Sequence, residues 1–196
     1  MTTPLSLRFV VSAPAVADLP PTTGEVAVMG RSNVGKSSLI NALSNRHDLA
    51  KVSKTPGRTR LLNLFEITEP AGGTVVDLPG YGYAAVSRQT QAGWPRMIAN
   101  YLTDRAGLHM VMVLIDGEIG PTKMDVDMLG WVRGLGVPLT IVATKQDKVR
   151  QQQRLRRKQD LAAACSVPAG DVLWVSAAKG PGVDTLRASV RAWLAG

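Results

Sequence analysis

The stretch from Gly30 to Ser38 reads Gly-Arg-Ser-Asn-Val-Gly-Lys-Ser-Ser and fits the pattern G-x-x-x-x-G-K-[ST]. An apolar run at 25–29 precedes it and a helical pattern at 36–43 follows it, which is the setting that a phosphate-binding loop requires. Its glycines let the backbone approach a phosphate, and the helix N-terminus presents its positive dipole end. A Gly-rich turn that matches by chance is the alternative, and the flanking strand and helix disfavour it. We therefore predict an α/β fold that binds phosphates at this loop.

Every residue of this loop is a candidate contact to the phosphates or to a metal ion: Gly30, Arg31, Ser32, Asn33, Val34, Gly35, Lys36, Ser37 and Ser38. The lysine of such loops reaches the β- and γ-phosphates, so we expect Lys36 to act in catalysis. The hydroxyl after the lysine ligates Mg²⁺, and here it belongs to Ser37. The loop alone predicts bound phosphates with Mg²⁺ and says nothing about the base.

Composition fits a single globular domain. With 196 residues, 45% of them hydrophobic, the chain can bury a sizeable core. We expect one domain at 23–196, after an extension at 1–22 that holds a candidate edge strand at 7–11. The one cysteine, Cys165, excludes an internal disulfide and fits a reducing compartment. Neither a signal segment nor an apolar run of membrane-spanning length is visible, so we expect a cytoplasmic monomer without membrane insertion.

The formal charge of +8 is unevenly distributed along the chain. Residues 51–60 carry four basic side chains and residues 148–158 carry six, and neither stretch contains an acidic residue. Such clusters favour a polyanionic partner, because neutralising nucleic-acid phosphates releases counterions. A solvated helix face and a surface loop are the alternative interpretation.

Strand-like and helix-like segments alternate along the chain. The predicted strands cover 25–29, 61–67, 73–77, 108–115, 138–143 and 172–175, and the predicted helices cover 36–43, 91–103, 124–135, 148–165 and 183–194. The short connection 68–72 makes the second and third strands an antiparallel hairpin. We predict the α/β class: a three-layer fold with a six-stranded, mostly parallel sheet, one antiparallel strand and helices on both faces.

A second motif, Asp77-Leu78-Pro79-Gly80, stands at the end of the third predicted strand. Open α/β sheets bind their ligands at the carboxyl ends of the strands, so this D-x-x-G pattern lies where phosphates are expected. We expect the Asp77 carboxylate to hold Mg²⁺ through water and the Gly80 N–H to meet the γ-phosphate. Leu78 and Pro79 are also placed in the nucleotide-binding set.

The end of the fifth predicted strand indicates the base. Thr144-Lys145-Gln146-Asp147 is close to the pattern N/T-K-x-D. The Asp147 carboxylate can accept hydrogen bonds from guanine N1–H and the 2-amino group, whereas adenine offers neither donor. Lys145 is expected to lay its aliphatic stem across the base. These residues predict GTP, although Thr144 in place of the commoner Asn predicts a weaker brace to the phosphate loop.

Two further segments complete the predicted site. Backbone N–H groups after the last strand are expected to face the guanine carbonyl, and the residues concerned are Val175, Ser176 and Ala177. The loop 51–60 is expected to supply another Mg²⁺ ligand, and we favour Thr59 over Thr55 because it lies directly before a strand. The nucleotide-binding set here is Gly57, Arg58, Thr59, Arg60 and Leu61. GTP would hold this loop and 78–90, and hydrolysis would release them, which makes the protein a switch.

On these motifs the chain resembles the EngB family of bacterial ribosome-biogenesis GTP-binding proteins, which belong to the translation-factor-related P-loop GTPases. Besides the phosphate loop, the resemblance rests on 53–59 (Ser-Lys-Thr-Pro-Gly-Arg-Thr), 77–84 (Asp-Leu-Pro-Gly-Tyr-Gly-Tyr-Ala) and 144–148 (Thr-Lys-Gln-Asp-Lys), and it covers nearly all of 7–194. It implies a P-loop GTPase fold, Mg²⁺ ligation by Ser37 and Thr59, and a role in assembly of the large ribosomal subunit. Thr144 matches the family's own pattern.

Catalysis is the least specified part of the site. Tyr81 follows D-x-x-G, where Ras-like enzymes place a glutamine that orients water, so we predict slow intrinsic hydrolysis. Asn33 resembles the asparagine of cation-dependent GTPases, in which K⁺ stands where an arginine finger would, and a loop-bracing Asn33 is the alternative. The other hypothesis is that a partner such as the pre-ribosome supplies the missing stabilising group for hydrolysis or only orders the switch. The catalytic candidates are Lys36, Asn33 and Gly80.

Together these patterns predict a GTP-hydrolysing switch that docks on ribosomal RNA or a large-subunit precursor through its basic surface. The alternative is a GTP-dependent adaptor that binds a protein at division or membrane sites without RNA contact. An ATP-using P-loop kinase is a third reading, which Asp147 disfavours.

Overall fold

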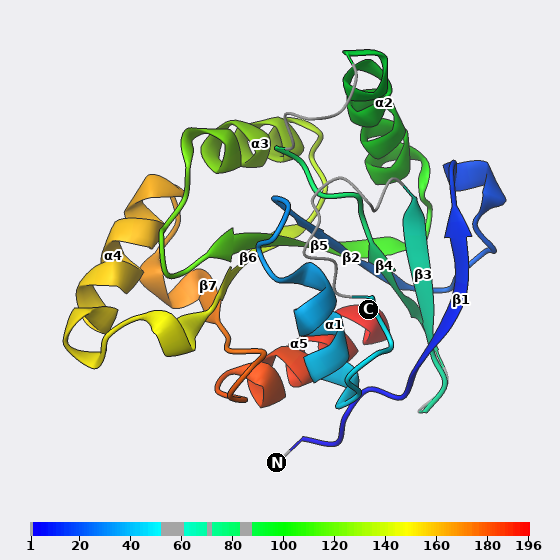
Figure 1. The fold of residues 1–196 in the computed structure, drawn as a ribbon. Coiled ribbons are helices and arrows are strands. Elements are labelled where there is room, and N and C mark those ends of the chain that lie inside the picture. Colours follow the sequence, from blue (N-terminus) through cyan, green and yellow to red (C-terminus); the bar gives the residue numbers. More distant parts are fainter. Residues whose placement is uncertain (1, 52–60, 70–71, 83–87) are drawn as a thin grey trace.

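A computed structural model describes residues 2–51, 61–69, 72–82 and 88–196 of the chain. These residues form a seven-stranded sheet with the order β1-β3-β4-β2-β5-β6-β7 (Figure 1). The strands are β1 (Leu7–Ala13), β2 (Glu25–Gly30), β3 (Leu62–Ile67), β4 (Thr74–Asp77), β5 (Leu108–Asp116), β6 (Leu139–Thr144) and β7 (Val172–Trp174). Only β3 among them runs against the others, since it pairs antiparallel with both β1 and β4. The mostly parallel α/β sheet with one antiparallel strand is therefore confirmed.

The predicted count of six strands is corrected to seven. β1 pairs with β3 from Leu7↔Ile67 to Ala13↔Leu62, with an irregularity between Phe9 and Val11. In the sequence it resembles a separate edge strand, because five of its seven residues stay at least partly exposed in the sheet. The pairing adds the seventh strand to the edge of the sheet, while the domain boundary at residue 22 remains a prediction.

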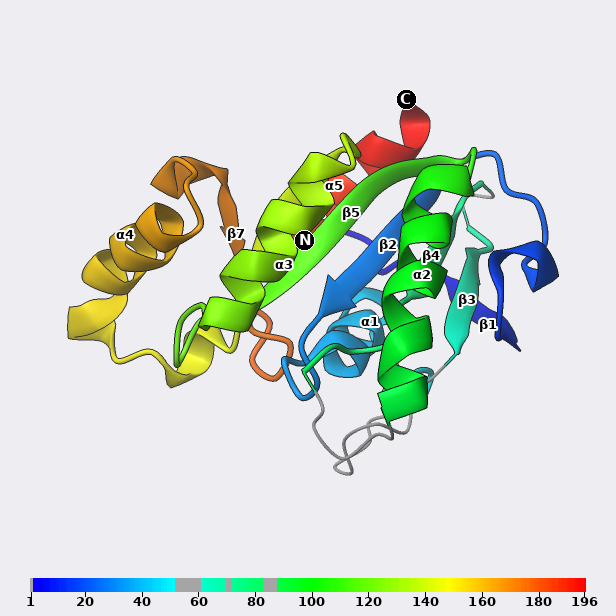
Figure 2. The same cartoon turned by 90° about the horizontal axis from the view of Figure 1, so that it is seen from above.

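Five helices of the described chain cover the two faces of the sheet (Figures 1 and 2). On one face, α1 (Lys36–Ser44) and α5 (Val183–Ala195) bury Leu39 and Leu186 in a core with β2 and β5. On the other face, α2 (Arg88–Asp104), α3 (Lys123–Gly134) and α4 (Arg154–Ala164) bury Ile98, Leu129 and Leu161. This is the predicted three-layer arrangement. No described helix is long and apolar enough to cross a membrane.

The helix predicted at 148–165 begins later than expected. Two short 3-10 turns, Gln146–Lys148 and Gln151–Gln153, precede α4. Between them Val149 is buried in the core, and Arg150 has φ −55° and ψ 136°, so the chain is extended there. Burying one apolar side chain thus interrupts a run whose polar residues would otherwise continue a helix.

The carboxyl ends of β2, β5 and β6 meet at one edge of the sheet. Gly30 pairs with Leu114, and Asp116 pairs with Thr144, so the ends of the three strands are in register. From β2 the chain passes through α1 to β3 and β4 on one side of β2, and α2 then leads to β5 on the other side. The strand order therefore reverses between β2 and β5, which is where open α/β sheets form a ligand crevice.

Candidate nucleotide-binding site

The loop from Gly30 to Ser38 has the geometry that its glycines predict. A Cβ on Gly30 would lie 2.8 Å from Val34 Cγ1 and 3.1 Å from the Leu114 carbonyl oxygen, so only glycine fits. Gly35, which caps the N-terminus of α1, has φ +109°, and Asn33 has φ +65°. The loop therefore turns through two left-handed residues before the helix begins at Lys36, and it presents backbone N–H groups at the positive end of α1.

The D-x-x-G segment lies directly against this loop. The Ser32 N–H donates to the Tyr81 carbonyl over 2.9 Å, and Arg31 and Tyr81 form a parallel bridge. A Cβ on Gly80 would lie 3.0 Å from Lys36 Nζ and 3.1 Å from Ser32 Oγ. A larger residue at Gly80 would crowd both groups, so glycine keeps its N–H accessible beside the Lys36 ammonium.

Asp77, at the end of β4, is a buried carboxylate with an unsatisfied oxygen. It is 3% exposed, and its Oδ1 has no hydrogen-bond partner in the described structure. Burial raises the pKa of Asp77, the nearby Lys36 ammonium offsets part of this rise, and the net pKa is about 6. A buried anion that the protein leaves unpaired is costly unless it meets a cation. Hard oxygen ligands from Asp77 and the Ser37 hydroxyl fit Mg²⁺.

Thr144 braces the end of β6 to the phosphate loop. Its Oγ1 donates to the Val34 carbonyl over 2.7 Å and approaches the Ile115 carbonyl at 3.3 Å. The side chain is buried, so this hydrogen bond is shielded from water. Thr144 thus makes the hydrogen bond to the phosphate loop that the sequence predicts to be weaker than one from asparagine.

The segments after β6 and β7 come together beside this loop. The Ser176 hydroxyl donates to Asp147 Oδ1 over 2.5 Å and accepts the Lys179 N–H at 3.1 Å. The Gln146 N–H donates to the Val175 carbonyl over 3.1 Å. One Asp147 oxygen is fixed by Ser176, and the carboxylate stays exposed on a short 3-10 turn. This orientation suits a group that accepts hydrogen bonds from a purine edge.

Lys145 adopts φ +55° and its ammonium lies 2.6 Å from Asp116 Oδ2. Asp116 also closes the turn after β5, because its carboxylate accepts the Glu118 and Ile119 N–H groups. The contact with Lys145 is an additional role that no local pattern signals, because the two residues are 29 positions apart.

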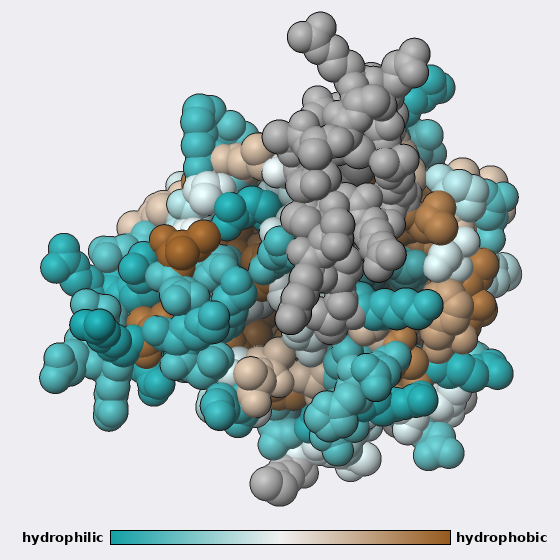
Figure 3. Space-filling view, in the orientation of Figure 1, coloured by the Kyte–Doolittle hydropathy of each residue, from teal (hydrophilic) through white to brown (hydrophobic). Residues whose placement is uncertain are grey.

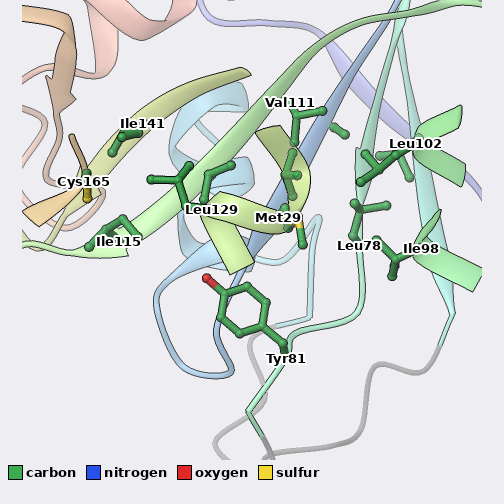
Figure 4. Packing of buried hydrophobic residues seen from close by; sticks show 14 of the residues in the cluster. Met29, Leu78, Tyr81, Ile98, Leu102, Val111, Ile115, Leu129, Ile141 and Cys165 are labelled. Atoms are coloured by element: carbon green, nitrogen blue, oxygen red, sulfur yellow. The ribbon is translucent and has the colours of Figure 1, made fainter. Parts of the chain in front are cut away.

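Tyr81 turns away from the candidate site. Its ring lies in the core with Met29 and Leu129 (Figure 4). Its hydroxyl donates to Asp125 Oδ1 over 3.0 Å. Burial, followed by the charge of Asp125, raises the pKa of Tyr81 above its ordinary value. Tyr81 therefore does not offer its phenol to a reacting water in this conformation.

The structure thus gathers most of the predicted residues at one edge of the sheet. They are Gly30–Ser38, Asp77–Gly80, Thr144–Asp147 and Val175–Ala177. Leu61 is exposed directly before β3. The predicted residues Gly57, Arg58, Thr59 and Arg60 lie outside the described residues. A cavity of about 250 Å³ adjoins the site, and it is lined by Ser38, Asn41, Ala42, Asn45, Arg46, His47 and Ala177. Five of these lining residues, Asn41, Ala42, Asn45, Arg46 and His47, carry no nucleotide motif, so the sequence did not place them beside the site.

This combination of sheet, phosphate loop and paired strand-end motifs defines the class of P-loop GTPases. Residues 25–145 match the family model described as "50S ribosome-binding GTPase". Among solved structures, the fold is similar to that of a probable GTP-binding protein engB, with a TM-score of 0.71 and 23% identity over 88% of this chain and 99% of that chain. It is also similar to Era in complex with MgGDPNP and a segment of 16S ribosomal RNA, with a TM-score of 0.72 and 23% identity over 89% of this chain and 58% of that chain.

Curated relatives narrow the assignment. The chain is 41% identical to the probable GTP-binding protein EngB of Pelotomaculum thermopropionicum over 95% of this chain and 94% of the relative. It is 42% identical to the Enterobacter sp. protein of the same description over 96% of this chain and 91% of the relative. The chain belongs to the EngB family of GTP-binding proteins, and it is a GTPase.

Proposed function

We propose that this GTPase is a switch whose GTP form acts in assembly of the large ribosomal subunit. The observation that carries the GTP assignment is Asp147, which Ser176 holds by one oxygen while the carboxylate remains exposed at the strand-end edge. Water attacks the γ-phosphorus, the bond to the β-phosphate oxygen breaks, and GDP and inorganic phosphate leave. The cytoplasmic location and the monomeric state belong to this proposal.

Competition between nucleotides tests the base assignment. We expect unlabelled GTP and GDP to displace labelled GDP, and ATP to fail at the same concentration, because adenine cannot donate to Asp147. Displacement by ATP as effective as that by GTP would contradict guanine recognition. Lys145 and the Ala177 N–H complete the base-binding set in this proposal. The Ser176 N–H, which the sequence predicted to face the guanine carbonyl, donates to the Pro181 carbonyl over 2.8 Å, so Ser176 acts here through its hydroxyl on Asp147.

The phosphate-binding roles follow from the positions of the loop and of Gly80. Lys36 would pair with the β- and γ-phosphates, and the Gly80 N–H would meet the γ-phosphate. Ser37, Asp77 and Thr59 are the proposed Mg²⁺ ligands, and the bound ion would neutralise charge that develops on the β- and γ-phosphates. Removing Mg²⁺ with EDTA should weaken GTP binding by the wild type. In Asp77→Asn, EDTA should change the affinity for GTP much less.

Intrinsic hydrolysis should be slow, because the buried Tyr81 bonds to Asp125 and cannot orient a water. We propose that K⁺ at Asn33, or a partner, supplies the missing stabilisation. Asn33 is exposed, with φ +65°. Asn33→Gly removes its side chain and keeps the left-handed backbone. We expect faster turnover in KCl than in NaCl, and loss of that difference in Asn33→Gly. Equal rates of the wild type in both salts contradict the K⁺ proposal.

The basic surface around α4 supports a polyanionic partner. Lys148, Arg150, Arg154 and Arg156 are exposed, and hydrophilic side chains gather over α4 on the left of the space-filling view (Figure 3). The matching family model is described as a 50S ribosome-binding GTPase, which points to the large subunit as the source of that polyanion. Of the other basic stretch, 51–60, the residues 52–60 lie outside the described residues.

Co-sedimentation with large-subunit particles tests the partner. We expect binding in GTP and not in GDP, and binding that weakens as salt rises. Arg154→Gln/Arg156→Gln should weaken it, whereas the control Arg8→Gln/Lys123→Gln, which also removes two exposed positive charges, should not. Nucleotide-dependent binding to a protein alone, without RNA, would favour the adaptor alternative.

A further inference from the structure

Asp116 is a buried carboxylate at the end of β5, 4% exposed and paired in register with Thr144. Its Oδ1 accepts the Glu118 N–H over 3.0 Å and approaches the Ile119 N–H at 3.4 Å. Its Oδ2 lies 2.6 Å from Lys145 Nζ. Local N–H groups therefore fix one side of the carboxylate, and the other side is directed at one ammonium.

The Asp116 and Lys145 pair differs from the exposed ion pairs of this chain. The side chains of Lys145 and Asp116 are 31% and 6% exposed, whereas the side chains of Lys123 and Asp127 are 88% and 60% exposed. Charges in a partly buried pair are screened less by water and salt, so they restrict the side chains more strongly.

Restricting the Lys145 side chain before a ligand arrives would favour binding of that ligand. A lysine stem has four carbons and many rotamers, and ordering it when a ligand binds reduces affinity. Its backbone is already fixed in a left-handed conformation, and the Lys148 N–H donates to its carbonyl over 2.9 Å. With the ammonium held by Asp116, both ends of the stem are fixed before a base arrives.

We propose that Asp116 is a positioning residue of the guanine site. It holds the Lys145 ammonium so that the aliphatic stem is ordered along one side of the base pocket. This inference rests on the proposed base-binding role of Lys145 and adds the residue that orients it. The base is common to GTP and GDP, so loss of the contact weakens both nucleotides by the same factor.

The first test is Asp116→Asn. The side-chain oxygen of Asn can still accept the Glu118 N–H, while its NH₂ group would face the Lys145 ammonium and repel it. We expect GDP and GTP to dissociate about tenfold faster, with the ratio of the two affinities unchanged. Asp127→Asn, which removes the carboxylate of an exposed pair on α3, should leave both dissociation rates at the wild-type value.

A double-mutant cycle separates positioning from a structural role. Lys145→Met removes the ammonium and keeps an apolar stem, so Asp116→Asn should add no further effect in that background. If Asp116→Asn changes the dissociation rate by the same factor in the wild type and in Lys145→Met, Asp116 does not act through Lys145, and the inference is wrong.

Truncating the Lys145 side chain distinguishes the inference about Asp116 from the proposed base-binding role of Lys145. If Lys145→Ala dissociates GDP at the wild-type rate, the proposed role of Lys145 at the base is wrong, and the Asp116 inference falls with it. If Lys145→Ala dissociates GDP faster and Asp116→Asn does not, guanine binding by Lys145 stands and the inference alone is overturned. Thermal unfolding of the nucleotide-free variants reports whether each one folds.

Discussion

At the scale of single residues, side chains from separate strands hold the phosphate loop in place. Thr144 reaches the Val34 carbonyl although it is shorter than the asparagine that commonly occupies this position. The contact is made because β6 ends beside the loop and because Thr144 is buried between Val34 and Ile115. Loop geometry in this protein thus depends on a hydroxyl 110 residues away in the sequence.

Removing that hydroxyl should loosen the loop. Thr144→Val keeps the shape of the side chain and leaves the buried Val34 carbonyl without its donor, which costs about 1–2 kcal/mol of unfolding free energy. We expect weaker GDP binding as well, because the loop loses its fixed position. Thr140→Val on the same strand, which loses no side-chain hydrogen bond present in the described structure, should change neither quantity. Denaturant unfolding and GDP dissociation rates measure the two effects.

Residue-level prediction from sequence succeeds where a motif is contiguous and fails where contacts are long-range. Lys36, Asp77 and Asp147 stand within short patterns at strand ends, so their positions follow from the sequence and the α/β fold. Tyr81 and Asp125 are 44 residues apart, and no periodicity pairs them. The pairing is a tertiary contact: the first turn of α3 places Asp125 beside Arg31, which forms a bridge with Tyr81.

At the scale of elements, the turn between β7 and α5 fixes the groups around Ser176. The Ser176 N–H donates to the Pro181 carbonyl over 2.8 Å, and the Gly180 N–H donates to the Ser176 carbonyl over 2.9 Å. Gly182 caps α5 with φ +78°, and a Cβ there would lie 1.9 Å from the Trp174 carbonyl oxygen. The turn can close only because this position carries no side chain.

Two glycines of this turn separate steric clash from backbone strain. Gly180 has φ +92° and open space around it, so Gly180→Ala should cost about 1 kcal/mol from the left-handed backbone alone. Gly182→Ala adds a clash with backbone atoms and should cost roughly 3–4 kcal/mol. Gly182→Ala should also release GDP faster, because Ser176 and Asp147 shift with the turn. Equal destabilisation by the two variants would show that the turn opens without cost.

Element boundaries follow from the sequence less securely than element types. The types and order of the predicted strands and helices are confirmed, because long apolar runs and 3.6-residue spacing are strong local signals. The start of α4 shifted from 148 to Arg154 because Val149 enters the core. Burial of one valine is decided by the sheet beneath it, so the segment's own pattern does not reveal it.

At the scale of the whole molecule, the N-terminal segment is hydrogen-bonded to α1 and to the last helix, α5. Arg187 donates to the Ala42 and Leu43 carbonyls at the end of α1, and its other nitrogen approaches the Thr2 carbonyl at 3.4 Å. Leu5 is fully buried, and its N–H donates to the Leu43 carbonyl over 2.9 Å. The N-terminal segment therefore contributes to the same core that supports the phosphate loop.

Two buried phenols should make the whole molecule sensitive to alkali. Burial is the largest cause that raises the pKa of Tyr81, and it likewise raises the pKa of Tyr101, whose hydroxyl donates to the buried Glu25 carboxylate over 2.6 Å. Above pH 10 the unfolded chain releases both phenol protons while the folded chain keeps them. The unfolded state then binds fewer protons, so stability that is fully present below pH 10 falls as pH rises further.

Tyr81→Phe isolates the contribution of one phenol to this fall. Each retained proton contributes a slope of about −1.4 kcal/mol of unfolding free energy per pH unit, so the variant should show a slope shallower than that of the wild type by about this amount between pH 10 and 11.5. Burial also raises the pKa of the Cys165 thiol, but that group is present in both proteins and cancels in the difference. Below pH 9 the variant should be less stable by about 1 kcal/mol, because Asp125 loses a donor. Urea unfolding across the pH series measures both effects, and parallel slopes would mean that Tyr81 ionises in the folded protein as it does in the unfolded chain.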